Sequence, residues 1–176
     1  MGKHRKWIQL SIFVFVLLVV GVTATNALMR GEDKPPEVGD TAPSFELETL
    51  GGGTADLSEY RGKPVVINFW GTFCPPCVEE TPALQRMYEK YEEQGVAILG
   101  VNLAEKPIVR IEQFVERFDV SYPVLLDPEL AVRDRYGVRS YPTTFFVDAE
   151  GVVREIKVGG MTEGYIEANI RKLLQP

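Results

Sequence analysis

Cysteine and histidine are scarce in this chain of 176 residues, which has two cysteines, Cys74 and Cys77, and one histidine, His4. A structural zinc site usually needs four cysteine or histidine ligands, so zinc on this pair would also require carboxylates or a second chain. Covalent haem attachment needs Cys-x-x-Cys-His, and position 78 is a valine. A cysteine hydrolase needs an imidazole, and His4 lies in the basic N-terminal segment. These shortages favour redox chemistry as the use of the cysteine pair.

Positive charge is also scarce beyond the first residues. The 19 basic residues include Lys3, Arg5 and Lys6, so the 147 residues after Met29 hold 16 basic and all 25 acidic residues, a net charge of −9. Nucleic-acid binding needs a basic surface that contacts phosphates. The acidic body therefore argues against a nucleic-acid partner, and its plainest explanation is solubility.

Only one apolar run is long enough to cross a bilayer, namely Trp7–Met29, which has 23 residues and no charged side chain. The basic cluster before it should stay in the cytoplasm, so the chain beyond the run should be exported. A signal peptide cleaved after Ala24 or Ala27 is the alternative, but the run is longer than the usual apolar core of a signal peptide. We therefore expect a basic flank and transmembrane anchor at 1–29, a charged linker at 30–38 and a folded domain at 39–176.

Strands and helices alternate along the predicted domain. Apolar and β-branched runs predict strands, and apolar residues at helical spacing predict helices. We expect strands at 44–50, 64–71, 96–103 and 122–127 and a strand pair within 143–160, and helices at 75–94, 108–120, 128–138 and 161–174. This order predicts an α/β domain whose first strands are parallel and covered on both faces, with the late hairpin adding antiparallel edge strands.

The stretch FWGTFCPPC places both cysteines where a buried strand ends and a helix begins. Free N–H groups and the helix dipole stabilise a thiolate there, so Cys74 should be exposed and attack first. Cys77 returns to the same side of the first turn and should be the more buried, resolving partner. A structural disulfide, two buried bystander cysteines and a metal-carrying module are the alternatives that the residues leave open.

The chain resembles the membrane-anchored TlpA/ResA branch of thiol–disulfide oxidoreductases. The resemblance rests on FWGTFCPPC, on Tyr141-Pro142-Thr143 and on GDTAPSFEL at 39–47, and covers about residues 37–175. It implies a thioredoxin-like fold, in which helices flank a central mixed β-sheet, with an N-terminal hairpin and an inserted helix–strand unit after the transmembrane helix. It implies no cofactor beyond a redox-active Cys74–Cys77 disulfide.

The same resemblance implies roles for other residues. Pro142 matches a cis-proline whose neighbours, Tyr141 and Thr143, offer backbone hydrogen bonds to a bound peptide. Glu80, one turn after Cys77, would lie beside the cysteines and relay a proton. The remaining expected substrate contacts around the motif are Trp70, Phe73, Pro75 and Pro76. Asn68 stands where thioredoxins have a buried acid, and we expect it to pair with backbone.

We therefore expect a membrane-bound disulfide reductase with its catalytic domain outside the cytoplasm. The resemblance implies that it reduces the Cys-x-x-Cys-His disulfide of apocytochrome c, or of another exported protein, before haem attachment. It also implies a membrane thiol carrier of the CcdA or DsbD type as electron donor. Pro75 departs from the ResA pattern, which has an acid between the cysteines. A disulfide-forming oxidase, a general exported reductase and a peroxidase using Thr72 with a supporting arginine are the alternatives.

Overall fold

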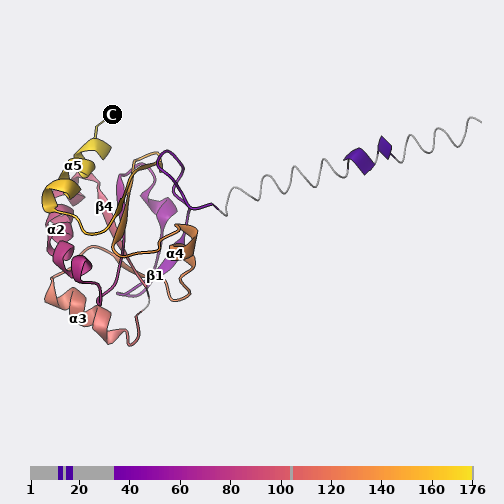
Figure 1. Ribbon diagram of the computed structural model, residues 1–176. Coiled ribbons are helices and arrows are strands. Elements are labelled where there is room, and N and C mark those ends of the chain that lie inside the picture. The colour runs from indigo at the N-terminus through magenta and orange to yellow at the C-terminus, as the bar shows by residue number, and fades with distance from the viewer. Residues whose placement is uncertain (1–11, 14, 18–33, 104, 176) are drawn as a thin grey trace, which may run out of the picture. The chain divides into compact units, whose positions relative to one another are not determined.

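The structure, a computed structural model, describes residues 12, 13, 15–17, 34–103 and 105–175 (Figure 1). The expected anchor at 1–29 lies largely outside these residues. Within the described part of the chain, no helix is both long and apolar enough to cross a membrane. The chain divides into two units, Met1–Lys34 and the compact Pro35–Pro176. In the compact unit, the amide of Gly39 donates to the carbonyl of Val153 at 2.8 Å.

A single seven-stranded sheet in the order β2-β1-β5-β4-β3-β6-β7 forms the centre of the compact unit. The three middle strands β5, β4 and β3 are parallel to one another, and every other pairing is antiparallel. This mixed sheet, flanked by helices, confirms the predicted α/β class. The strands are β1 (Glu46–Thr49), β2 (Thr54–Asp56), β3 (Val65–Trp70), β4 (Ala97–Asn102), β5 (Val124–Leu126), β6 (Thr143–Val147) and β7 (Val153–Val158).

Helices cover both faces of the sheet, with α2, α3 and α5 on one side and α4 on the other (Figure 1). A hydrophobic core lies on each face: Val66 and Trp70 of β3 pack in the first core, and Ile67 and Phe69 in the second. Strand side chains alternate between faces, so a strand covered on both needs apolar residues almost throughout. The helices are α2 (Pro75–Tyr91), α3 (Val109–Arg117), α4 (Ala131–Arg135) and α5 (Glu163–Leu173), with short 3-10 turns η2 (Leu57–Tyr60) and η3 (Glu92–Gln94).

Helix α2 begins directly after the strand that supports it. Cys74 is its N-cap, and Pro75 takes the first helical position, where a missing N–H group costs no hydrogen bond. The helix passes into η3, and Gly95 then ends it with a φ of 84°, a left-handed conformation that favours glycine. The sequence signals for both ends therefore act as predicted.

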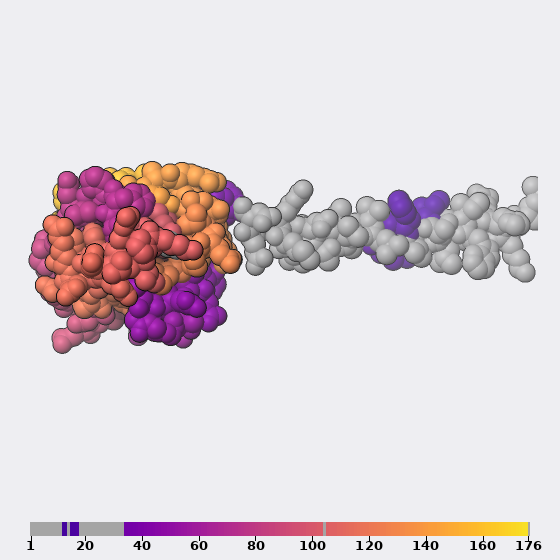
Figure 2. All heavy atoms as spheres, turned by 90° about the horizontal axis from the view of Figure 1, so that it is seen from below, coloured from indigo at the N-terminus to yellow at the C-terminus, as the bar shows by residue number. Residues whose placement is uncertain are grey.

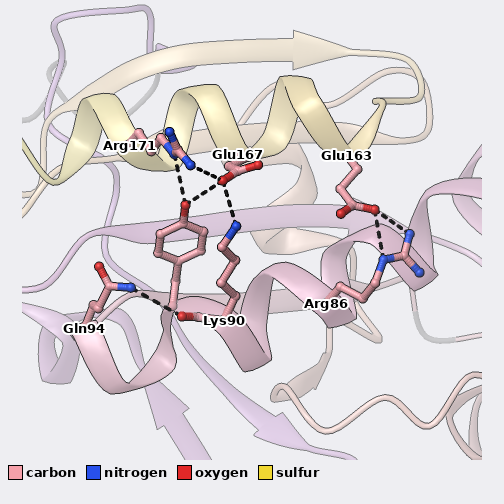
Figure 3. A network of polar contacts seen from close by, with 7 residues as sticks. Arg86, Lys90, Gln94, Glu163, Glu167 and Arg171 are labelled. Carbon is pink, nitrogen blue, oxygen red and sulfur yellow. Dashed lines mark hydrogen bonds and ion pairs between the residues drawn. The ribbon is translucent and has the colours of Figure 1, made fainter.

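Ion pairs join the exposed sides of α2 and α5 (Figure 3). Arg86 contacts Glu163 at 2.6 Å, and Glu167 accepts from both Lys90 at 2.8 Å and Arg171 at 2.6 Å. The Arg86 and Lys90 pairs fasten the last helix of the chain to the helix that carries the cysteines, and the Arg171 pair lies within α5.

Two predicted elements differ from the structure. The helix expected at 128–138 is only the five-residue α4, because Leu130 adopts a left-handed φ of 59° that excludes it and the residues before it. The hairpin expected to add two edge strands contributes only one, since β6 lies between β3 and β7. All five residues of β6 are buried, which suits an interior strand covered on both faces.

Candidate active site

Cys74 and Cys77 form a disulfide across the first turn of α2, with their Cα atoms 5.2 Å apart. The Cys74 sulfur also accepts a hydrogen bond from the Cys77 amide at 3.3 Å, so it caps the helix. Cys74 is 5% exposed and Cys77 1%. Cys74 is the more exposed of the two cysteines, as predicted. The expectation that Cys74 would be exposed to solvent is, however, wrong in this oxidised state. Its sulfur is turned back over the helix end by the cap and by the bond to Cys77.

The surface at this end of the compact unit is built from segments far apart in sequence. Figure 2 shows the coral atoms of the α3 region in front, with magenta residues on one side and the purple β1–β2 region on the other. Phe73 is 64% exposed and meets the ring of Tyr141 edge-on at 6.5 Å. A Cβ atom on Gly160 would lie 3.1 Å from that of Pro76, so the segment after β7 packs closely against the motif. The start of α2, where the disulfide lies, is thus surrounded by Phe73, Tyr141 and the prolines Pro75 and Pro76.

The Tyr141–Pro142 peptide bond is cis, as the resemblance predicted. Pro142 precedes β6, and its carbonyl accepts from the Gly159 amide at 2.8 Å. Thr143 is buried and lies in β6, paired with Phe69 of β3 and Val158 of β7. Tyr141 is only half-buried and is therefore the more accessible of the two expected backbone partners.

Trp70 does not line the surface. Its side chain is 3% exposed and its ring stacks at a tilt on Phe114 of α3, with centroids 4.7 Å apart. The last residue of β3 thus points into the core beneath α3 in this structure, away from the surface where substrate would bind, and its substrate contact stays a prediction. The indole Nε1 is buried without a hydrogen-bond partner.

Glu80 lies in the interior, one turn after Cys77. It is 2% exposed, and each carboxylate oxygen accepts one hydrogen bond, from Asn68 Nδ2 at 2.8 Å and from the Met161 amide at 2.9 Å. Burial raises the pKa of this carboxyl from 4.5 to about 7, while the two hydrogen bonds act in the opposite direction by favouring the charged form. A carboxyl with a pKa near neutrality can both accept and release a proton.

Asn68 pairs differently from the expectation that it would bond to backbone. Its side-chain amide donates to Glu80 and to Thr144 Oγ1, both at 2.8 Å. The alternation of β3 puts Asn68 on the same face as Val66 and Trp70, toward α2, but does not specify Glu80 as its partner. Glu79, by contrast, is not among the buried residues, as expected of a solvated helix surface.

Sequence reasoning missed Glu105, which follows β4 and is 33 residues from its partner. Its carboxylate accepts from the amide of Thr72 at 2.5 Å, from the Thr72 hydroxyl and from Asn102 Nδ2 at 3.1 Å. No local spacing could have indicated this contact between two loops. Because the Thr72 hydroxyl is committed to Glu105, it is not free to activate a peroxide, which weighs against the peroxidase alternative.

Among residues 34–103 and 105–175, no group of three or more histidine, cysteine, aspartate or glutamate side chains is arranged to hold a metal ion. The chemistry that the site displays directly is that of the Cys74–Cys77 disulfide. A disulfide at the start of a helix can be opened and closed by exchange with other thiols while its supporting strand and helix stay in place. The molecule is, in class, a thiol–disulfide redox protein.

Known proteins define the class more closely. The AhpC/TSA family matches residues 38–156. Thiol-disulfide oxidoreductase ResA of Halalkalibacterium halodurans is 37% identical over 174 residues, covering 99% of this chain and 97% of that protein. ResA of Bacillus subtilis is also 37% identical, covering 99% and 96%. A Chlorobium tepidum crystal structure assigned to the DsbE type of thiol:disulfide interchange protein has a TM-score of 0.74 at 30% identity, over 80% of this chain and 99% of that one.

The chain therefore belongs to the ResA-like thiol–disulfide oxidoreductases, and its catalytic domain falls within the AhpC/TSA family. The predicted thioredoxin-like fold and the predicted enzyme class, a thiol–disulfide oxidoreductase, are confirmed.

Proposed function

We propose that this enzyme is a membrane-tethered reductase that acts outside the cytoplasm on the Cys-x-x-Cys-His disulfide of apocytochrome c before haem is attached. The observation that carries the proposal is the Cys74–Cys77 pair at the start of α2 with the buried Glu80 one turn behind it. The likeness to thiol-disulfide oxidoreductase ResA over 99% of the chain supports thiol–disulfide exchange as the chemistry, and the family resemblance implies the reductive direction. The basic cluster and apolar run at 1–29 support tethering and export.

The reaction starts from the reduced enzyme. The helix N-terminus stabilises the Cys74 thiolate, which attacks one sulfur of the client disulfide. A mixed disulfide forms between Cys74 and the client, the client's own disulfide breaks, and its second sulfur leaves as a thiolate that takes up a proton.

Cys77 then resolves the mixed disulfide. The Glu80 carboxylate accepts the proton of the Cys77 thiol, and the resulting thiolate attacks the Cys74 sulfur. The client's remaining sulfur leaves and is protonated, so the client gains two electrons and two protons in all. The enzyme ends with the Cys74–Cys77 disulfide, which is the state of this structure.

The client's segment would lie across the surface around the sulfurs. Phe73 and Tyr141 provide apolar contacts, with Pro75 and Pro76 beside them, and the backbone at Tyr141, next to cis-Pro142, offers hydrogen bonds to an extended peptide. In the oxidised state of this structure both cysteines are nearly covered, and Cys74 has the larger exposed part.

Electrons return from a membrane thiol carrier of the CcdA or DsbD type, which would reduce the Cys74–Cys77 disulfide by the same exchange in reverse. No cofactor beyond this disulfide enters the scheme.

A Cys77→Ala variant tests the proposal, because it can attack a client but cannot resolve the mixed disulfide. We expect the reduced full chain to be trapped as a covalent adduct with an oxidised apocytochrome c, and a Cys74→Ala variant to form none. Trapping of other exported proteins in place of apocytochrome c would overturn the client assignment.

Pro75 favours a second candidate, a general exported oxidoreductase or disulfide-forming oxidase. The ResA pattern has an acid between the cysteines, and its absence here makes the thiolate easier to form. A more stable thiolate makes the reduced form more stable and the couple more oxidising. Formation of disulfides in a reduced, unfolded protein by the oxidised enzyme would favour this candidate over the first.

A further inference from the structure

Asn68 lies on β3 beneath the start of α2 and is 2% exposed. Its side-chain amide has two N–H donors, and each has one acceptor: Glu80 Oε1 and Thr144 Oγ1, both at 2.8 Å. Thr144 sits directly opposite Asn68 in the β3–β6 pairing. The bond to Thr144 therefore fixes the rotation of the amide so that its other hydrogen points at Glu80.

The immediate environment of Glu80 supplies uncharged donors. In the described part of the chain, its hydrogen-bond partners are Asn68 and the Met161 amide, and no lysine or arginine pairs with it. The buried Tyr122 is a titratable group coupled to it, and the pKa of this tyrosine is raised by burial and also by the charge of Glu80; Cys77, one turn before Glu80, is held in the disulfide and does not titrate in this state. Asn68 is thus the only side chain that donates to this carboxylate among the described residues.

We propose that Asn68 is a positioning residue of the reaction, which holds the Glu80 carboxylate in one orientation and stabilises its charged form. The proposal rests on the proposed role of Glu80 as the proton acceptor of Cys77. A buried carboxylate with a single amide partner would keep its proton at neutral pH and could not accept another. An amide suits this position better than an acid, since an aspartate would compete with Glu80 for one proton.

The test follows the carboxyl carbon of Glu80 by NMR in the oxidised full chain, assigned by its loss in Glu80→Gln. We expect the titration midpoint to rise by about one pH unit in Asn68→Ala, the size expected for one hydrogen bond to a charged group. Asn68→Asp keeps the shape of the side chain. In this variant we expect two coupled titrations, one of them with a midpoint above that of Glu80 in the unaltered protein. The pH profile of disulfide reduction should move by the same amount as the Glu80 midpoint.

Asn169 provides the matched control, because it is a second buried asparagine whose amide donates to the backbone carbonyl of Tyr165, at 3.0 Å, and not to Glu80. Asn169→Ala should lower the melting temperature and leave the Glu80 midpoint unchanged. An unchanged midpoint in folded Asn68→Ala and Asn68→Asp would overturn the proposal. The titration needs no client, so a failure to reduce apocytochrome c would count against the proposed function and not against the role of Asn68.

Discussion

Glu80 and Glu167 lie toward opposite ends of the contact between α2 and α5, and their surroundings differ completely. Glu80 is buried, accepts from two uncharged donors, and its pKa is raised to about 7 by burial. Glu167 stands in the ion-pair cluster of Figure 3, where hydrogen bonds from Lys90, then Tyr91 and Arg171, lower its pKa to about 2. The same helix pair thus holds one carboxyl that can exchange a proton near neutral pH and one that stays charged.

The difference shows what each end of the contact is built for. Cations that pair with a carboxylate make it a fixed charge and join two helices, but they remove its ability to take up a proton. Neutral donors in a site without water leave the pKa of the carboxyl near neutral pH, and the charged carboxylate then lowers the stability of the fold. At the catalytic end of α2 the buried carboxyl therefore lowers stability when it is charged. At the far end, the ion pairs hold α2 and α5 together.

The largest expected effect is on catalysis. Glu80→Gln keeps the shape and the bond from the Met161 amide but cannot accept a proton, so disulfide reduction by the reduced enzyme at neutral pH should slow by about 100-fold. Glu167→Gln and Glu79→Gln, both outside the buried site, should leave the rate unchanged. Stopped-flow measurement with an oxidised client peptide checks this, and equal rates for Glu80→Gln and Glu167→Gln would remove the distinction between the two carboxyls.

A second expected effect concerns stability as a function of pH. Between pH 4.5 and about 7 the folded enzyme keeps the Glu80 proton that the unfolded chain releases, so the free energy of unfolding should fall as pH rises through this window. Glu80→Gln has no such carboxyl and should not show this fall. The free energy of unfolding of the variant, minus that of the unaltered protein, should therefore be up to about 3 kcal/mol higher at pH 8 than at pH 4. Denaturant unfolding at both pH values measures it, and parallel pH dependence of the two proteins would speak against a buried, shifted carboxyl.

A third, smaller effect has the opposite pH dependence. The lowered pKa of Glu167 stabilises the fold above pH 4.5, and this contribution is lost as pH falls toward about 2. Glu167→Gln should lower the melting temperature by about 2 °C at pH 7, less in high salt, and not at all near pH 2. Thermal unfolding monitored by circular dichroism is sufficient, and a deficit that persists at pH 2 would show that packing, not charge, explains the loss.

The smallest effect is expected for Arg86→Ala. The side chains of Arg86 and Glu163 are 54% and 44% exposed, so their pair competes with water and should contribute under about 1 kcal/mol. A melting temperature within about 2 °C of the unaltered protein is expected at all salt concentrations. If Arg86→Ala lowered the melting temperature more than Glu167→Gln, the Arg86–Glu163 pair would be the stronger stabilising contact between the two helices.

Most elements could be predicted from the sequence because their signals are local. The buried runs of β3 and β4, the N-terminal proline of α2 and the glycine after η3 depend on residues within one element. The two cysteines were equally clear, since their spacing and their place between strand and helix are both visible in the chain. The cis bond before Pro142 came from resemblance, because spacing alone does not distinguish it from a trans bond.

Contacts between distant segments could not be predicted. The Asn68–Glu80 and Thr72–Glu105 bonds depend on how β3, α2 and the loop after β4 meet, and their partners are 12 and 33 residues apart. Trp70 is buried because α3 covers the end of β3. An aromatic residue beside a redox motif gives no sign in the sequence that a distant helix will cover it. The interior position of β6 likewise depends on the order of strands in the sheet, which the chain order does not specify.

The reduction potential of the Cys74–Cys77 couple determines whether the enzyme gives electrons to its client or takes them, so its measurement is the decisive test of a reductive role. It is measured by equilibrating the full chain with glutathione or dithiothreitol buffers and quantifying free thiols at pH 7. For a disulfide reductase we expect a potential in the reducing range, near the value of about −270 mV typical of thioredoxin. A potential near about −120 mV, that of a strong disulfide-forming oxidant, would contradict it.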